Sequence, residues 1–530
     1  MNAPAVATTA PARWLARLLP WLAGLAQACA IAAPWSGQPL WWLQIASLAV
    51  LVWQLDGLRR TEAPRAWRRA GLVAWAFATA WLCGSTWWLF VSMHTYGGLA
   101  APLAAVAVLA LAAALALYYA AAAAFYVAFA PVRRAGAVLL FAAAWTLAEL
   151  LRNSLFTGFP WGAGGYAHVD GPLSFYAPWV GVYGVGAVAA AIAALVAAVV
   201  HDQGRGKRVM ALALALVLLG APALVAAVRS APDEATLSRG RLELALLQGN
   251  IPQDEKFIPG GGVATALQWY GEQLLRATAP LVITPETALP LLGSQLPPGY
   301  LDAIAARYAN SAQTAIVGLP LGDGRVYTNT VLGFGPGRST PYRYDKHHLV
   351  PFGEFVPGLF RWFTDMMNIP LGDFQSGGLA QRPLAWQGQR IAPNICYEDL
   401  FGDEIGANFR DESQAPTVLL NVSNIAWFGD TIAIDQHLAI SRMRALEFQR
   451  PMVRATNTGA TAVIDHRGRV THALPRLTRG VLVASVEGRA GLTPYAFWVS
   501  RFGLWPLWGL ALAIMAAVPL FLRRASRTAG

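Results

Sequence analysis

Long apolar stretches separated by short polar loops constrain this chain more than any other feature. A helix crosses a hydrocarbon core of about 30 Å with roughly 20 apolar residues. The chain is 56% hydrophobic and only 13% charged, which is too apolar for an ordinary soluble protein. We therefore predict a membrane bundle of about eight transmembrane helices. The predicted spans are residues 14–33, 40–55, 71–93, 99–130, 135–151, 172–200, 209–228 and 499–522.

Basic residues cluster in alternate loops of this predicted bundle. The connections after the first, third and fifth spans carry almost no arginine apart from Arg152. Because basic loops stay in the cytoplasm, the segment after the seventh span should face outward, into the periplasm of a bacterium, from the inner membrane. The basic groups are Arg59, Arg60, Arg65, Arg68 and Arg69 after span two, Arg133 and Arg134 after span four, Arg205, Lys207 and Arg208 after span six, and Arg523, Arg524 and Arg527 after span eight.

The chain divides into three predicted parts. Residues 1–230 form the first seven spans, residues 231–495 have the mixed composition of a folded outer domain, and residues 496–530 form the last span and a tail. The first span is either a retained helix or a signal peptide, because it has a basic start and an Ala-x-Ala-like end at Ala28 to Ala30. Cleavage there would leave the orientation of the other spans unchanged.

Charge and cysteine content exclude several classes of protein. The formal charge of +11 comes without a long basic run, so membrane topology explains it better than nucleic-acid binding does. Two of the three cysteines, Cys29 and Cys83, lie in predicted spans, which leaves Cys396 without a disulfide partner. His347 and His348 are adjacent, and this spacing does not favour a shared metal. We expect neither a metal nor a cofactor.

The outer domain alternates short apolar segments with amphipathic ones. Predicted helices cover residues 264–277, 300–309 and 431–449, and Asp430 is the expected N-cap of the last. This alternation favours an α/β architecture in which helices cover a sheet. The predicted strands are residues 242–248, 280–284, 314–319, 389–395, 417–422, 452–456 and 461–465.

Three residues suit chemistry at a carbonyl group, and two of them, Glu286 and Cys396, follow predicted strands. Cys396 is a candidate nucleophile and Glu286 a candidate base, because a thiol needs a base to become a thiolate. Lys346 is one of only three lysines in an arginine-rich chain. Its compact ammonium fits beside a reacting oxygen better than a planar guanidinium does. The alternative for Lys346 is a structural ion pair with Glu354.

Taken in order, Pro285-Glu286-Thr287, Tyr344 to Glu354 and Asn394 to Asp399 resemble the Glu-Lys-Cys triad motifs of the nitrilase superfamily. Fused to a membrane bundle, they resemble the apolipoprotein N-acyltransferase family nearly end to end. This resemblance implies an α-β-β-α sandwich for the outer domain. Phe257 departs from it, at a position where the family often has tryptophan. Further matching segments are residues 157–161, 170–173, 248–250, 421–424, 426–430, 442–447 and 454–459.

The resemblance also implies a two-step reaction. Glu286 would take the proton of Cys396, whose thiolate would attack an acyl ester of a phospholipid, the donor. Lys346 and the backbone N–H of Tyr397 would stabilise the oxyanion. The α-amine of a diacylglyceryl-cysteine at an apolipoprotein N-terminus would then accept the acyl chain.

Other side chains of this predicted site have more than one possible role. Glu354 and Glu398 either orient Lys346 or are purely structural. Two groups of aromatic residues, one containing Trp362 and Phe363 and the other Trp427 and Phe428, either admit membrane lipids or pack in a core. Glu149 and Arg152 form either an interfacial pair or part of a lipid entrance. The expected lid and substrate-binding residues are Trp362, Phe363, Trp427, Phe428 and Asn329.

Two rival functions remain at this stage. A membrane-anchored amidase or nitrilase would use the same triad to release ammonia, but it has no need of a multi-span bundle. A transporter with an outward binding domain would place ionisable residues at mid-membrane, where the predicted spans have almost none.

Overall fold

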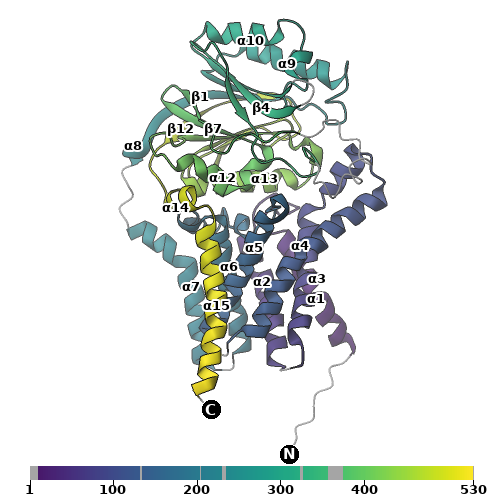
Figure 1. Cartoon of the computed structure of the whole chain (residues 1–530), viewed down its shortest axis with the longest axis vertical. Coiled ribbons are helices and arrows are strands. Elements are labelled where there is room, and N and C mark those ends of the chain that lie inside the picture. Colours follow the sequence, from purple (N-terminus) through teal and green to yellow (C-terminus); the bar gives the residue numbers. More distant parts are fainter. Residues whose placement is uncertain are drawn as a thin grey trace, which may run out of the picture.

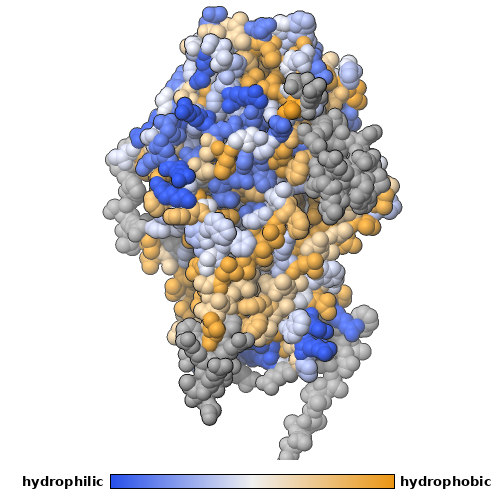
Figure 2. All heavy atoms as spheres, in the orientation of Figure 1, coloured by the Kyte–Doolittle hydropathy of each residue, from blue (hydrophilic) through white to orange (hydrophobic). Residues whose placement is uncertain are grey.

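Two structural parts make up the molecule, a bundle of long helices and a domain of two β-sheets stacked on one end of it (Figure 1). The computed structural model describes residues 10–61, 63–131, 134–202, 204–228, 234–322, 326–355 and 374–528. On the face shown in Figure 2, hydrophobic residues cover much of the bundle, whereas hydrophilic residues gather on the sheet domain. Trp362 and Phe363, two of the predicted lid residues, lie outside the described residues.

Every predicted span coincides with a long helix. Three spans are long and apolar enough to cross a membrane by themselves, Ala101–Phe129, Arg134–Thr157 and Pro172–His201. The pair α14 and α15, bent by 88°, makes a fourth if it is one span. The total of eight crossings stays a prediction. The bundle helices are α1 (Ala10–Ala28), α2 (Trp41–Arg60), α3 (Ala66–Thr86), α4 (Ala101–Phe129), α5 (Arg134–Ser154), α6 (Ala177–His201), α7 (Arg205–Val228), α14 (Pro494–Phe502) and α15 (Trp505–Thr528).

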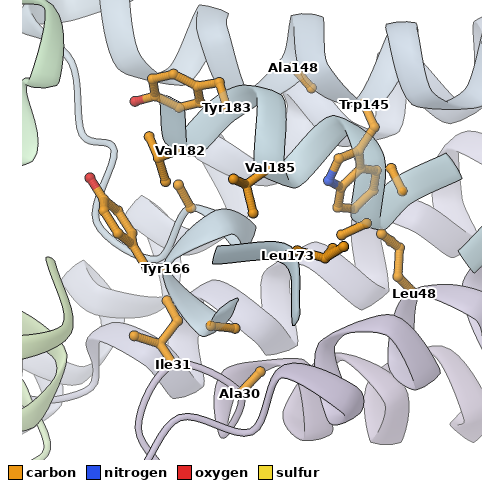
Figure 3. Close-up of a cluster of buried hydrophobic side chains, with 14 of the residues drawn as sticks. Ala30, Ile31, Leu48, Trp145, Ala148, Tyr166, Leu173, Val182, Tyr183 and Val185 are labelled. Atoms are coloured by element: carbon orange, nitrogen blue, oxygen red, sulfur yellow. The ribbon is translucent and has the colours of Figure 1, made fainter. Parts of the chain in front are cut away.

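Apolar side chains from several helices fill the centre of the bundle. Figure 3 shows Trp145 of α5, Leu48 of α2 and Val185 of α6 converging there. Small residues let the backbones approach, as membrane helices require. At Gly24 of α1 an added Cβ would lie 2.2 Å from the carbonyl oxygen of Phe77 in α3, so only glycine permits this crossing.

The basic loops meet at the end of the bundle away from the sheet domain (Figure 1). Arg134, the first residue of α5, forms ion pairs of 2.7 Å with Asp56 of α2 and Asp202 after α6. Arg60 donates to the carbonyl of His201 at 3.1 Å. The loops after the second, fourth and sixth helices therefore share one end, as the alternating charge predicts.

The described part of the outer domain contains two six-stranded sheets, in the orders β12-β1-β2-β3-β4-β5 and β11-β10-β9-β8-β7-β6. Strands β1, β2 and β3 are parallel, and so are β7, β8 and β9. The strands are β1 (Ser238–Gln248), β2 (Leu281–Ile283), β3 (Thr314–Gly322), β4 (Tyr327–Phe334), β5 (Tyr342–Asp345), β6 (Leu384–Trp386), β7 (Gln389–Ile395), β8 (Val418–Ser423), β9 (Met452–Thr456), β10 (Ala462–Ile464), β11 (Val470–Ala473) and β12 (Gly480–Arg489).

The two sheets pack face to face between helical layers, which confirms the α-β-β-α sandwich. Alternate residues of β1, such as Leu244 and Leu246, fill the space between the sheets together with Leu420 of β8. The helices α9 (Gly262–Arg276) and α10 (Tyr300–Ala309) cover the first sheet. The helices α12 (Gly402–Gly406) and α13 (Ala433–Phe448) lie between the second sheet and the bundle (Figure 1).

Two sequence expectations about this domain need correction. Strands β4, β5, β6, β11 and β12 lie where no strand was expected, because they are paired antiparallel and several are partly exposed, which weakens an apolar signal. Asp430 is not the N-cap of α13, which begins at Ala433. It instead forms an ion pair of 3.2 Å with Arg476.

Candidate active site

The predicted catalytic residues follow the carboxyl ends of strands from both sheets. Glu286 comes after β2 and Lys346 directly after β5, in the first sheet. Cys396 directly follows β7 in the second. Strand β3 is parallel to β2 and antiparallel to β4, and β4 is antiparallel to β5. Strands β2 and β5 therefore run in the same direction and end at the same edge of the sheet. The site therefore lies where the ends of the two sheets meet.

The carboxylate of Glu286 is held by three groups from different segments. Its Oε1 accepts a hydrogen bond of 2.7 Å from Asn329 Nδ2 and lies 3.4 Å from Lys346 Nζ. Its Oε2 accepts from the backbone N–H of Asn424 at 2.7 Å. The loop approaches β3 closely, because an added Cβ at Gly318 would lie 2.1 Å from the carbonyl oxygen of Pro285.

Lys346 lies between two carboxylates and is 1% exposed. Its Nζ is 2.8 Å from Glu354 Oε1 and 3.4 Å from Glu286 Oε1. Asn329 Nδ2 bridges the same two carboxylates, at 2.7 Å from Glu286 and 2.8 Å from Glu354. The ion pair with Glu354 thus exists, and so does the contact with Glu286 that a catalytic role requires. Asn329 thus lies in this carboxylate cluster, and its substrate-binding or lid role stays a prediction.

Cys396 occupies a strained turn between β7 and the 3-10 helix η7 (Cys396–Leu400). Its φ is +54°, a left-handed conformation that is uncommon for a residue with a side chain. The carbonyl of Cys396 accepts from Asn421 Nδ2 at 3.1 Å and lies 3.3 Å from His437 Nε2. These contacts hold the turn, and Cys396 as a whole residue is partly buried.

The charges of the site favour a neutral thiol at rest. Burial and the carboxylate of Glu286 raise the pKa of Cys396 to about 12, although Lys346 opposes them. Burial also favours protonated Glu286, but Lys346, Asn329, Asn424 and Lys256 together lower its pKa below the ordinary value. For Lys346, burial is outweighed by Glu354 and Glu286, which raise its pKa. Glu286 is therefore an ionised base beside a protonated lysine.

Glu398 binds backbone rather than Lys346. Its carboxylate accepts from the N–H groups of Ile395 at 2.5 Å and His347 at 2.6 Å, and from Tyr344 Oη at 2.9 Å. Burial raises its pKa to about 7, although the hydrogen bond from Ile395 opposes this. Glu398 thus ties the end of β7 to the segment that follows Lys346.

Two segments of the site contact the bundle. Tyr397, next to Cys396, donates its hydroxyl to the carbonyl of Gly158 at 3.0 Å. In η9 (Ile425–Phe428), the Phe428 ring lies 4.1 Å from that of Trp88 in the bundle. Trp427 packs edge-on to Tyr96 at 6.2 Å. Trp427 and Phe428 are each only partly buried and fill the junction between the two parts.

Lys256 is a site residue that the sequence reasoning missed. It lies in a polar stretch where either cation would serve, yet its side chain is only 2% exposed. Its Nζ lies 3.5 Å from the carbonyl oxygen of Glu286. Burial lowers its pKa to about 8, against the opposing charges of Glu286 and Cys396. The scarcity of lysine, which pointed to Lys346, is a signal that also marks Lys256.

Glu149 and Arg152 are not an interfacial pair. Both are 1% exposed, and no ion pair joins them within the described residues. Arg152 donates to the carbonyls of Phe159 at 2.9 Å and Trp161 at 2.6 Å. Glu149 accepts from the N–H of Gly164 at 3.0 Å. The reason is that the loop between α5 and α6 folds back into the bundle, where its backbone groups need partners.

Comparison with known proteins covers almost the whole chain. Residues 23–195 match the family model of the apolipoprotein N-acyltransferase N-terminal domain, and residues 243–495 match that of carbon-nitrogen hydrolases. An apolipoprotein N-acyltransferase of Verminephrobacter eiseniae is 59% identical over 511 residues, covering 92% of this chain and 94% of the relative. That of Ralstonia nicotianae is 47% identical over 489 residues, covering 92% and 90%. A CN-hydrolase superfamily structure from Xanthomonas campestris aligns at 22% identity, with a TM-score of 0.36, over 47% of this chain and 91% of that one.

Proposed function

The chain belongs to the apolipoprotein N-acyltransferase family and is an acyltransferase of lipoprotein maturation, and we propose that Cys396 carries the acyl group as a thioester. One observation carries this proposal: the Cys396 thiol, an ionised carboxylate and a protonated lysine meet at the edge where both sheets end. That arrangement supplies a nucleophile, a base and a cation for the oxyanion.

The first half-reaction acylates the enzyme. Glu286 accepts the thiol proton as the sulfur of Cys396 attacks the ester carbonyl of a phospholipid. Lys346 and the backbone N–H of Tyr397 stabilise the oxyanion of the tetrahedral intermediate. The carbon–oxygen bond then breaks, Glu286 returns its proton to the departing lysophospholipid oxygen, and the acyl chain stays on sulfur.

The second half-reaction transfers the chain to nitrogen. The α-amine of an N-terminal diacylglyceryl-cysteine attacks the thioester, and Glu286 takes a proton from that amine. The carbon–sulfur bond breaks, and the proton passes from Glu286 to the sulfur of Cys396. An amide forms on the lipoprotein, and the enzyme returns to its starting state.

The junction with the bundle supports lipid substrates. Tyr397, adjacent to the nucleophile, and Phe428, four residues beyond the Asn424 that holds Glu286, both contact bundle residues. We infer that an acyl chain reaches Cys396 along this junction, and that Trp427 and Phe428 line the path. A soluble amidase has no need of such a junction, so the amidase alternative is not favoured.

The protein is a membrane protein, and we infer that its site faces the periplasm from the bacterial inner membrane. The support is the gathering of basic loops at the end of the bundle away from the site, which the positive-inside rule assigns to the cytoplasm. We also retain residues 1–230, 231–495 and 496–530 as the proposed division of the chain.

The proposal is tested by intact-mass measurement of the purified protein after incubation with phospholipid. We expect an added acyl mass on the wild type, lost on treatment with hydroxylamine, and none on C396S. E286Q should acylate at least 100-fold more slowly. An acyl mass on C396S equal to that of the wild type would refute the role of Cys396.

A further inference from the structure

The ammonium of Lys256 is buried in the site without a carboxylate partner. It lies on the loop between β1 and α9, where the acidic neighbours Asp254 and Glu255 are exposed. Among the described residues, its only hydrogen bond is to the carbonyl oxygen of Glu286, at 3.5 Å. An ammonium carries three N–H donors. No carboxylate within the described residues lies at ion-pair distance from it.

Such a buried charge is costly to the fold. Burying an unpaired ammonium costs several kcal/mol in typical proteins, and a neutral side chain of similar length is often more stable in its place. A purely structural role would therefore favour methionine or leucine at this position. The cost indicates that the charge itself is used.

The charged and titratable groups around Glu286, the residue that Lys256 contacts, come from several elements of both sheets. Glu286 follows β2, Lys346 follows β5, and Cys396 follows β7, while Glu354 reaches Glu286 through Asn329 and Lys346. Two carboxylates thus share the single ammonium of Lys346. Without Lys256, these charged groups carry one net negative charge. A second positive charge beside the base offsets it.

We propose that Lys256 is a positioning residue for the general base. Its ammonium holds the segment of Glu286 through the backbone carbonyl, and its charge keeps the Glu286 carboxylate ionised until the thiol proton arrives. The inference rests on the proposed role of Glu286 in the acyl transfer. In support, Lys256 is the last of four groups that lower the pKa of Glu286 against burial, after Lys346, Asn329 and the backbone of Asn424.

The test is the pH profile of acyl-enzyme formation in K256M, with K207M as the matched control at the exposed lysine of α7. A nearby opposite charge typically lowers a carboxyl pKa by about 1 unit or more. The acid limb of K256M should therefore move up by about 1 pH unit, with a rate about tenfold lower on the acid side. The melting temperature of K256M should equal or exceed that of the wild type.

A second variant separates charge from hydrogen bonding. K256Q keeps a donor for the Glu286 carbonyl but removes the charge, so it should show the same shifted acid limb, and it serves if K256M does not fold. A wild-type acid limb in either folded variant would overturn the inference, and so would equal losses at every pH with a lowered melting temperature. If the wild type forms no acyl-enzyme on Cys396, the proposed function itself fails, and the inference fails with it.

Discussion

Replacement of Glu354 by glutamine tests the carboxylate cluster around Lys346. Glu354 accepts hydrogen bonds of 2.8 Å from Lys346 Nζ, Asn329 Nδ2 and the backbone N–H of Val350. An amide of the same shape has only one oxygen, so at least one of these donors would face an NH₂ group. A buried donor left unpaired costs about 1–3 kcal/mol, and a charge-assisted bond is worth about 1.5–3 kcal/mol.

We therefore expect E354Q to form the acyl-enzyme about 10- to 100-fold more slowly, since each 1.4 kcal/mol is about tenfold in rate. The assay is the initial rate of transfer from a phospholipid with a fluorescent acyl chain, read as labelled protein. E404Q is the matched control, because Glu404 lies 2.8 Å from His348 and does not contact Lys346. A folded E354Q within threefold of the wild type would refute this account of the cluster.

Three further predictions follow from the junction and from Lys256. Y397F loses the hydrogen bond to the carbonyl of Gly158, which is worth about 0.5–1.5 kcal/mol. We therefore expect acylation of this variant to be about two- to tenfold slower. An unchanged rate would show that the bundle contact does not position the site. F428A should raise the KM for phospholipid more than it lowers kcat, whereas a lowered melting temperature with unchanged KM would mean that Phe428 only packs. The pKa of Lys256 is lowered from 10.5 to about 8, so between those values the unfolded chain binds more protons than the folded one. The deprotonation of Lys256 should therefore raise the melting temperature of the wild type in detergent as the pH increases from about 8 to 10.5. K256M should lack this rise.

The strand ends of the outer domain could be predicted from the sequence because their apolar runs end in Pro, Asn or Gly. Strand β7 was predicted with its observed bounds, Gln389–Ile395, which placed Cys396 directly after a strand. Strand β5 was missed, since Tyr342–Asp345 contains two partly exposed residues and an exposed arginine. Because β5 was not predicted, the sequence did not explain why Lys346 lies at the same sheet edge as Glu286.

Other features of the site depend on long-range packing that no local pattern contains. The loop of Lys256 is polar, so nothing in its own sequence indicates that it folds inward beneath Glu286. Arg152 was expected near the membrane surface, but it binds the carbonyls of Phe159 and Trp161 inside the bundle. These partners belong to the loop that reaches Tyr397, which only the folded arrangement reveals.

The central claim is that Cys396 holds the acyl chain between donor and acceptor. The most direct measurement is a two-step chase: the protein is labelled with a phospholipid that carries an isotopically marked acyl chain, separated from free lipid, and mixed with a diacylglyceryl-cysteine peptide. We predict that the mark leaves Cys396 and appears as an amide on the peptide at equal rates. A marked amide formed while the label stays on the protein, or formed equally well by C396S, would contradict it.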